Sequence, residues 1–237
     1  MRRFYAPPEN IAADTVSLEL EETRHLRDVL RLRVGDEVNV FDGGGREFHC
    51  LIAAVDKRGS TLKIIAETSP VSPESPFPIT LAAAILKGDK FDLVIQKAVE
   101  LGIAAVVPIL TARGDVRPKD MDKRLGRWRR IAMEATKQCG RARLMSIGEP
   151  VSFGSLIASA KDAVLFSERG GSDLSPLETL KKITAFVGPE GGWDDSELDL
   201  ARSSGAAIVT LGGRILRAET ASISICTILQ HRFGDLK

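Results

Sequence analysis

Residues 183–193 read ITAFVGPEGGW, and residues 207–217 read AIVTLGGRILR. Each stretch is a short apolar run, typical of a strand buried in a sheet, followed by a glycine-rich loop. Glycine lets a ligand approach the backbone, so that main-chain amides and carbonyls can bind it. One such loop would equally indicate an ordinary tight turn. Two in succession favour a ligand site where these strands end.

The segments around these loops alternate between strand and helix patterns. Further apolar runs predict strands at Ile79–Leu86, Ala104–Ile109 and Ala163–Phe166. Helical spacing of apolar residues predicts helices over residues 89–102, capped by Asp89, and over 120–139, 195–203 and 218–233. Such alternation is typical of an α/β fold with a mainly parallel sheet, whose ligands bind at the carboxyl ends of the strands.

A proline-rich segment, SPVSPESPFP at residues 69–78, separates this region from the N-terminal part. Neither a helix nor a central strand can continue through it, so we expect two domains, at residues 1–72 and 77–237. In the first, Val38–Phe41 and Phe48–Val55 predict a β-hairpin around a glycine-rich turn. A short helix at about residues 21–31 is expected to turn Leu26, Val29 and Leu30 inward.

The composition is that of an ordinary globular protein, with 237 residues of which 43% are hydrophobic and 27% charged. The longest apolar run, residues 101–112, contains a proline and is too short to cross a bilayer. The N-terminus carries no apolar core of a secretory signal. The three cysteines and three histidines show no metal-ligand spacing. We therefore expect a cytoplasmic protein without a metal site or a membrane anchor.

The net charge of +1 conceals a basic segment. Residues 113–143 hold 11 basic and 4 acidic side chains, a local charge of +7. Such a cluster attracts polyanions, nucleic acid above all, although a solvated helix face would give the same pattern. The glycine loops match neither the dinucleotide-binding nor the P-loop signature, so we expect neither of those ligand classes.

The motifs FVGPEGGW (Phe186–Trp193) and LGGRILRAETA (Leu211–Ala221) resemble the SPOUT class of methyltransferases. Within that class, the chain is similar to the ribosomal RNA small subunit methyltransferase E family over nearly its whole length. The other motifs that carry this resemblance are HLRDVLRLRVGDEV at residues 25–38, QKAVELG at 96–102, EATKQCGR at 134–141 and RFGDL at 232–236. Several motifs in the same order make the resemblance specific.

The resemblance implies both architecture and activity. It implies a PUA-like N-terminal β-barrel that helps to hold RNA, and a C-terminal α/β domain tied in a deep trefoil knot. It implies a homodimer, with S-adenosylmethionine as the methyl donor. The implied reaction is methylation of N3 of a uridine in 16S ribosomal RNA, at position 1498, within the 30S subunit.

The resemblance also places the cofactor, among the loops that follow Phe166, Val187 and Leu211. For Ile215 and Leu216 core packing is the alternative, and for Thr220 capping of the last helix. The residues expected to contact the cofactor are Leu165, Phe166, Gly188, Glu190, Gly191, Gly192, Leu211, Gly212, Ile215, Leu216, Thr220 and Ala221.

Methylation of uridine N3 requires removal of the proton that N3 carries. A methyl group on a sulfonium is already activated, so positioning contributes most to its transfer. N3 must lose its proton, and a cation near O2 or O4 would stabilise the resulting imide anion. Arg217 is the candidate for that cation, and Glu219 for accepting the proton or orienting Arg217. A simple ion pair at a helix start is the alternative.

Polar residues within or beside the motifs are candidates for RNA contacts, mainly to phosphates. Aromatic residues make up only 5% of the chain, so we expect one flipped uridine and no broad stacking platform. The candidates are Arg3, His25, Arg27, Arg31, Lys87, Lys97, Arg113, Lys137, Gln138, Arg141 and Arg143.

Two other functions remain open on the sequence. One is a nucleotide-binding enzyme of another type, such as a small kinase or synthetase, although the chain lacks the GK[ST] loop that would hold its phosphates. The other is a non-enzymatic RNA-binding factor of the same fold, which would not need both glycine loops. Binding of S-adenosylmethionine separates the methyltransferase from both.

Overall fold

The computed structural model describes residues 2–116, 121–177 and 179–236. The chain divides into two compact units. Unit 1 consists of Met1–Glu74 together with Thr136–Leu144, and unit 2 of Ser75–Ala135 together with Met145–Lys237. A segment from the middle of the chain therefore folds with the N-terminal unit, an arrangement that the proline-rich boundary alone does not indicate.

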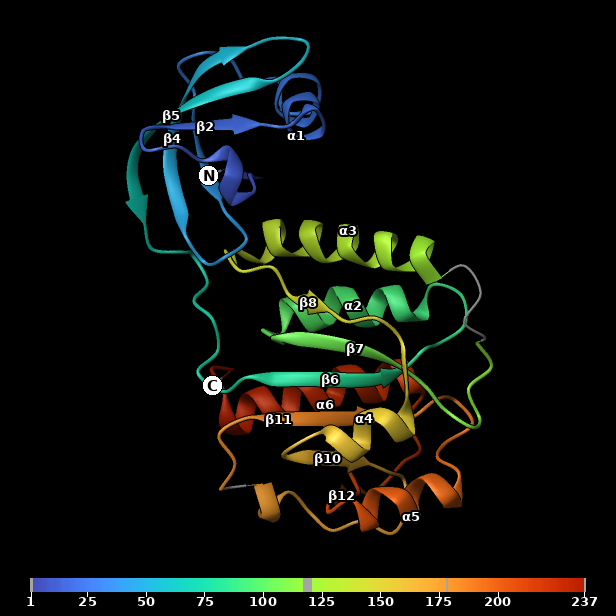
Figure 1. Cartoon of the computed structure of the whole chain (residues 1–237). Helices are drawn as coiled ribbons and strands as arrows, with labels where there is room; N and C mark the ends of the chain where they lie inside the picture. Colours follow the sequence, from blue (N-terminus) through green and yellow to red (C-terminus); the bar gives the residue numbers. More distant parts are fainter. Residues whose placement is uncertain (1, 117–120, 178, 237) are drawn as a thin grey trace. The chain divides into compact units, whose positions relative to one another are not determined.

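Unit 1 is built on a curled five-stranded sheet with the order β1-β3-β4-β5-β2 (Figure 1). The predicted hairpin is confirmed, because β3 and β4 pair antiparallel with Phe41 opposite Glu47. The other strands were not predicted, since they are short or carry many polar residues. The strands are β1 (Arg3–Tyr5), β2 (Thr15–Leu18), β3 (Glu37–Phe41), β4 (Glu47–Val55) and β5 (Ser60–Thr68).

The helix expected at about residues 21–31 is interrupted. A short 3-10 turn, η1 (Pro8–Asn10), precedes it, and α1 (Leu20–Arg24) passes into a single π-helical turn, η2 (His25–Val29). The wider turn changes which side chains face the core. Leu26 is buried as predicted, whereas Val29 is 65% exposed, so the prediction that Val29 points inward was wrong.

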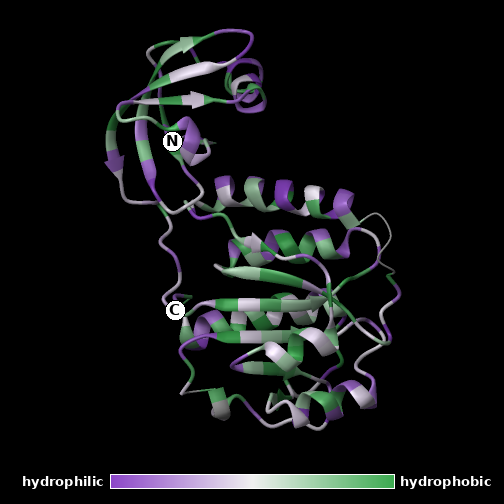
Figure 2. Ribbon diagram, viewed as in Figure 1, coloured by the Kyte–Doolittle hydropathy of each residue, from purple (hydrophilic) through white to green (hydrophobic). Residues whose placement is uncertain are grey.

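Unit 2 contains a parallel sheet with the order β12-β10-β11-β6-β7-β8, and β9 pairs with β7. All five predicted strands are confirmed within a few residues, and Figure 2 shows them as mostly hydrophobic. The strands are β6 (Ile79–Ala84), β7 (Ala105–Leu110), β8 (Ser146–Ile147), β9 (Val151–Ser152), β10 (Ala163–Phe166), β11 (Ile183–Val187) and β12 (Ala207–Val209).

The four predicted helices are also present, although residue 120 of the second lies outside the described residues. Asp89 occupies the N-cap of α2, but its side chain makes no capping bond within the described structure and instead accepts a hydrogen bond from Arg127. α4 and the 3-10 turn η3 (Ser175–Leu177) are too short for periodicity to show. The helices are α2 (Lys90–Glu100), α3 (Met121–Cys139), α4 (Phe153–Ser159), α5 (Asp195–Ser203) and α6 (Ala218–Phe233).

Helices cover the parallel sheet and bury its apolar strands. Side chains of α4 and α5 join those of β6, β10 and β11 in one core cluster, which contains Phe153, Leu165, Phe186 and Leu198. Helix α6 contacts β6 and β11 and packs against α2. The loop after β10 runs back along β12, where Ser172 N donates to the carbonyl oxygen of Ile208 at 2.9 Å. The trefoil knot stays a prediction.

Candidate functional site

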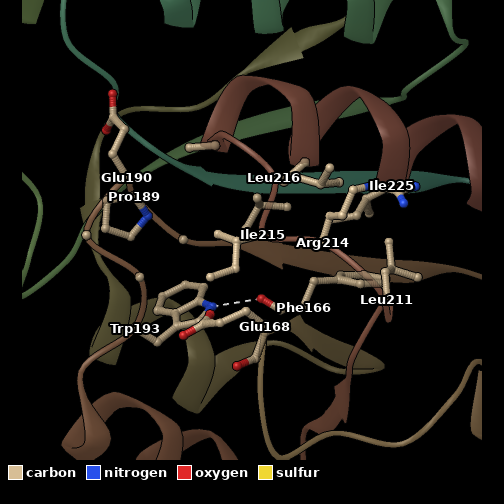
Figure 3. A pocket seen from close by; sticks show the side chains of 17 residues that line it. Phe166, Glu168, Pro189, Glu190, Trp193, Leu211, Arg214, Ile215, Leu216 and Ile225 are labelled. Atoms are coloured by element: carbon tan, nitrogen blue, oxygen red, sulfur yellow. Dashed lines mark hydrogen bonds between the residues drawn. The ribbon is translucent and has the colours of Figure 1, made fainter.

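A cavity of about 280 Å³ opens beside the carboxyl ends of β10 and β11 and the loop after β12 (Figure 3). This is where parallel sheets place their ligands. Both glycine-rich loops contribute to its wall, together with the start of the loop after β10 and one face of α6. The lining residues are Phe166, Ser167, Glu168, Val187, Gly188, Pro189, Glu190, Gly191, Gly192, Trp193, Leu211, Arg214, Ile215, Leu216, Ala218, Ala221 and Ile225.

Trp193 fixes the geometry of the first glycine loop. Its side chain is only 1% exposed, and its indole Nε1 donates to the carbonyl oxygen of Phe166 at 2.8 Å. This bond ties the end of β10 to the loop after β11 (Figure 3). A Cβ atom on Gly188 would lie 3.0 Å from the indole ring, so any larger residue there would press against the buried ring. Gly192 adopts φ +69°, which also favours glycine.

A capping box ends this loop at the start of α5. The side chain of Asp194 accepts from Ser196 N, and the carboxylate of Glu197 accepts from Asp194 N at 3.0 Å. Hydrogen bonds from Ser196, with a further contribution from Arg113, hold the pKa of the Asp194 carboxyl below its usual range. The loop is thus anchored at both of its ends.

The second glycine loop is apolar and open. Ile215 is 87% exposed and Leu216 is 39% exposed, although both line the cavity (Figure 3). Core packing, the alternative reading of these two residues, does not describe them. A large exposed apolar side chain beside a cavity is typical of a surface that a ligand covers. Capping by Thr220 is not seen either, because Arg217 occupies the N-cap of α6.

Most of the residues expected around the cofactor line this one cavity, but three do not. Leu165 is fully buried in the core of the sheet, and Gly212 and Thr220 are exposed outside the lining. Glu168, Trp193 and Arg214 also line the cavity, although the sequence did not predict them as contacts. Trp193 stood within a quoted motif. Glu168 could not be found in this way, because its loop matches none of the motifs that carry the family resemblance.

Charged groups gather on the other side of the first loop. The backbone of Glu190 belongs to the cavity wall, but its carboxylate points away from the cavity (Figure 3) and accepts from Lys90 Nζ at 2.9 Å. This hydrogen bond is the main reason why the pKa of Lys90 is raised. The charge of Glu219 raises it further and that of Arg217 opposes the shift. Both candidate catalytic residues therefore lie within electrostatic range of Lys90.

Three of the RNA candidates lie in buried or partly buried ion pairs of unit 1. Arg3 pairs with Glu47, Lys137 with Glu22 and Arg141 with Glu74. Arg3 also donates to the carbonyl oxygens of Thr136, Lys137 and Arg141, which fastens the last turn of α3 and the segment that follows it to the sheet. A phosphate would have to displace these partners. These contacts assign the three side chains a part in the folding of unit 1, and their expected role in RNA binding stays a prediction.

The other RNA candidates are accessible. His25, Arg31, Gln138 and Arg143 are exposed, and Arg27 pairs with its neighbour Asp28. In unit 2, Lys87 pairs with Asp115 at the surface, Lys97 with Glu100, and Arg113 with Asp194 at the end of the first glycine loop. Arg113 thus has a clear part in holding that loop.

Within residues 2–116, 121–177 and 179–236, no histidine, cysteine, aspartate and glutamate side chains gather in a way that could hold a metal ion. In the same part of the chain, no helix combines the length and the apolar character needed to cross a bilayer.

Comparisons with known proteins agree on one family. An RNA methyltransferase domain family matches residues 73–230, and an RNA methyltransferase PUA domain family matches residues 18–65. The chain is 36% identical to ribosomal RNA small subunit methyltransferase E of Synechocystis, over 92% of this chain and 74% of that protein. It is 29% identical to the enzyme of that name from Bacillus subtilis, over 93% and 91% of the two chains.

A solved structure extends this likeness to three dimensions. The crystal structure of a ribosomal RNA small subunit methyltransferase E from Neisseria gonorrhoeae, bound to S-adenosyl methionine, superposes with a TM-score of 0.92. The two sequences are 34% identical, and the match covers 100% of each chain.

Proposed function

The chain belongs to the RNA methyltransferase family that includes ribosomal RNA small subunit methyltransferase E, and from this premise we propose that it methylates N3 of a uridine in 16S ribosomal RNA. The methyl donor is S-adenosylmethionine. The observation that supports this most directly is the cavity between the two glycine loops, at the carboxyl ends of parallel strands. We further infer a cytoplasmic homodimer that acts on the 30S subunit.

The residues around the cavity fit a cofactor with both apolar and polar parts. Ile215 and Leu216 can cover an adenine ring, while Gly188, Gly191 and Gly192 leave main-chain groups accessible beside it. When bound, S-adenosylmethionine supplies a methyl group on a positively charged sulfur. The rigid loop between Val187 and Asp194 holds its binding site in place, which suits a reaction that depends on positioning.

Arg217 and Glu219 are the residues that we assign to the uracil ring. They begin α6, directly after the second glycine loop, and so lie beside the bound cofactor in this proposal. Glu219 takes the proton from N3, and Arg217 stabilises the charge that spreads onto O2 and O4. The exposed basic residues, among them Arg27, Arg31 and Arg143, hold the phosphates around the target. We assign RNA binding mainly to residues 1–72 and catalysis to the knotted domain of residues 77–237.

The test is a methyl-transfer assay with labelled S-adenosylmethionine. The substrates are 30S subunits and naked 16S RNA from a strain that lacks N3-methyluridine, and the product is identified by nucleoside analysis. We expect label in N3-methyluridine from 30S subunits. Label in another nucleoside would overturn the proposed base, and label in naked RNA alone would overturn the proposed substrate.

Variants then assign the roles. We expect Arg217→Ala and Glu219→Gln to lower kcat roughly 100-fold or more, as removal of a charge-stabilising or proton-accepting group does in other enzymes. Binding of S-adenosylmethionine, measured by calorimetry, should change little. If the wild-type protein does not bind S-adenosylmethionine, the result would favour the non-enzymatic RNA-binding factor instead.

A further inference from the structure

We propose that Lys90 is a further catalytic residue, whose ammonium group binds a carbonyl oxygen of the target uracil while N3 is deprotonated. This inference rests on the proposed function, because it concerns the same reaction. Neither the sequence motifs nor the glycine loops pointed to Lys90. The contacts of unit 2 do.

The position of Lys90 is the first observation. It is the first residue of α2, and its Nζ donates to Glu190 Oε1 at 2.9 Å across 100 residues of sequence. Glu190 lies in the loop that walls the cavity, but its carboxylate is directed out of the cavity (Figure 3). Lys90 therefore stands behind the cavity wall and does not line the cavity, on the side of the first loop to which the carboxylate of Glu190 points.

The second observation concerns the charged groups around Lys90. The charge of Glu219 on α6 raises the pKa of Lys90 and that of Arg217 lowers it, so both residues lie within electrostatic range of the Lys90–Glu190 pair. The remaining charged groups of this end of α2 are otherwise engaged. Asp89 and Asp92 pair with Arg127, and Lys87 pairs with Asp115. Lys90 is thus the ammonium group that α2 presents to this cluster.

Glu219 supplies the third observation. Its Oε2 is buried and has no hydrogen-bond partner among the described residues. A buried carboxylate oxygen without a donor costs free energy, and an incoming N–H group would relieve that cost. The N3–H group of a uracil ring is a donor flanked by two carbonyl oxygens. A base that gives N3–H to Glu219 places one of those oxygens within the same charged cluster as Lys90.

These positions describe a balanced step. The N3 proton moves to the carboxylate of Glu219, and the nitrogen lone pair forms the new bond to the methyl carbon. The bond between that carbon and sulfur breaks, and its electron pair stays on sulfur, leaving S-adenosylhomocysteine. Lys90, released in part from Glu190, and Arg217 neutralise the charge on O2 and O4 during this step.

The effect of substituting Lys90 on catalysis can be separated from an effect on folding. The Lys90–Glu190 pair is partly exposed, and pairs of that kind contribute little to stability. Variants of Lys90 should therefore fold, and circular dichroism can check this. Lys161→Met provides the matched control, because Lys161 is exposed and precedes β10, at the opposite end of the same sheet.

The experiment measures kcat and KM for 30S subunits in wild-type, Lys90→Met, Lys90→Arg and Lys161→Met enzymes. We expect Lys90→Met to lower kcat about 100-fold, the effect of losing one charge-stabilising donor. Lys90→Arg should keep part of the rate, and Lys161→Met all of it. The ratio of the wild-type kcat to the Lys90→Met kcat should fall as the pH rises, because N3 then loses its proton more readily without a stabilising cation. Affinity for S-adenosylmethionine should stay within about twofold, since Lys90 does not line the cavity.

Three outcomes would overturn the inference. They are a wild-type kcat in Lys90→Met, a defect confined to the KM for the subunit, or a loss of cofactor affinity. A defect in KM alone would make Lys90 a phosphate contact. If the wild-type enzyme makes no N3-methyluridine, the proposed function fails and this inference with it. If the wild type makes that product and Lys90→Met does so equally fast, only this inference fails.

Discussion

Unit 1 uses basic side chains inside its fold, whereas unit 2 leaves charged and apolar side chains accessible around a cavity. In unit 1, Arg3 is bonded to the buried Glu47 and to three carbonyl oxygens. In unit 2, Ile215 stands almost fully in solvent, and Lys90 forms a partly exposed pair. Lys137 and Arg141, which form ion pairs in unit 1, and Ile215 of unit 2 all lie in motifs that carry the family resemblance. The difference teaches that a motif residue can be kept for the fold as well as for the reaction.

The largest effect is expected where a buried pair of unit 1 is broken. Arg3→Met leaves the carboxylate of Glu47 buried without its charged partner, which typically costs about 3–5 kcal/mol. Arg46→Met removes the partner of Glu67 from an exposed pair and should change stability little. Urea denaturation of both variants measures the difference. Equal losses would mean that the burial of the Arg3 pair has no energetic importance.

A slightly smaller effect is expected in the first glycine loop of unit 2. Gly188→Val would place a side chain against the indole of Trp193, which is buried and hydrogen-bonded and cannot move aside. Overpacking of this kind costs about 1–3 kcal/mol, so we expect affinity for S-adenosylmethionine to fall roughly 10–100-fold. Calorimetry with the purified protein measures it.

The control for this substitution is Gly126→Ala on α3. A Cβ atom there would meet nothing within 4 Å among the described residues, so cofactor affinity should be unchanged and the helix slightly more stable. A tight cofactor complex in Gly188→Val would show that the loop and the indole can separate, and that their packing does not shape the site.

The sequence predicted those parts of the fold that depend on local pattern. The buried strands β10 and β11 and the helices α5 and α6 follow from apolar spacing over a few residues. The glycine loops could be located for the same reason, since each directly follows such a strand. The π-helical turn at His25–Val29 could not, because one extra residue in a helix leaves no mark on composition.

Parts of the site that depend on distant segments escaped the sequence. Lys90 meets Glu190 because β6 and β11 are neighbours in the sheet, and strand order is not visible in a pattern. The ion pairs of Arg3, Lys137 and Arg141, which the sequence suggested only as RNA contacts, escaped prediction for a related reason. Residue type reveals a positive charge, but the partner that buries it is set by tertiary structure.

A moderate effect on binding, with none on stability, is expected at the mouth of the cavity. Ile215→Ser should leave the free energy of unfolding within about 0.5 kcal/mol, because the side chain is exposed. Cofactor affinity should fall about fivefold, as apolar area is lost from the complex. Val34→Ser, at an exposed valine of unit 1, should change neither quantity. If Ile215→Ser binds the cofactor normally, the second loop does not close over it.

The smallest effect concerns acid stability and compares one aspartate from each unit. Hydrogen bonds from Ser196 lower the pKa of Asp194, and backbone hydrogen bonds from Arg58 and Gly59 lower that of Asp56. A carboxyl whose pKa is lowered on folding stabilises the protein above its unfolded value, and that contribution is lost as the pH falls through the folded value. Melting temperatures of Asp194→Asn and Asp56→Asn should therefore lie slightly below that of wild type at pH 6, and the difference should vanish as the pH falls through the lowered folded pKa values. Because Asp194 ends the cofactor loop and pairs with Arg113, only Asp194→Asn should also weaken cofactor binding at neutral pH. Equal cofactor affinity in both variants would mean that Glu197 alone holds the end of this loop. The charge of Asp194 would then contribute only to the stability of unit 2, as the charge of Asp56 contributes to the stability of unit 1.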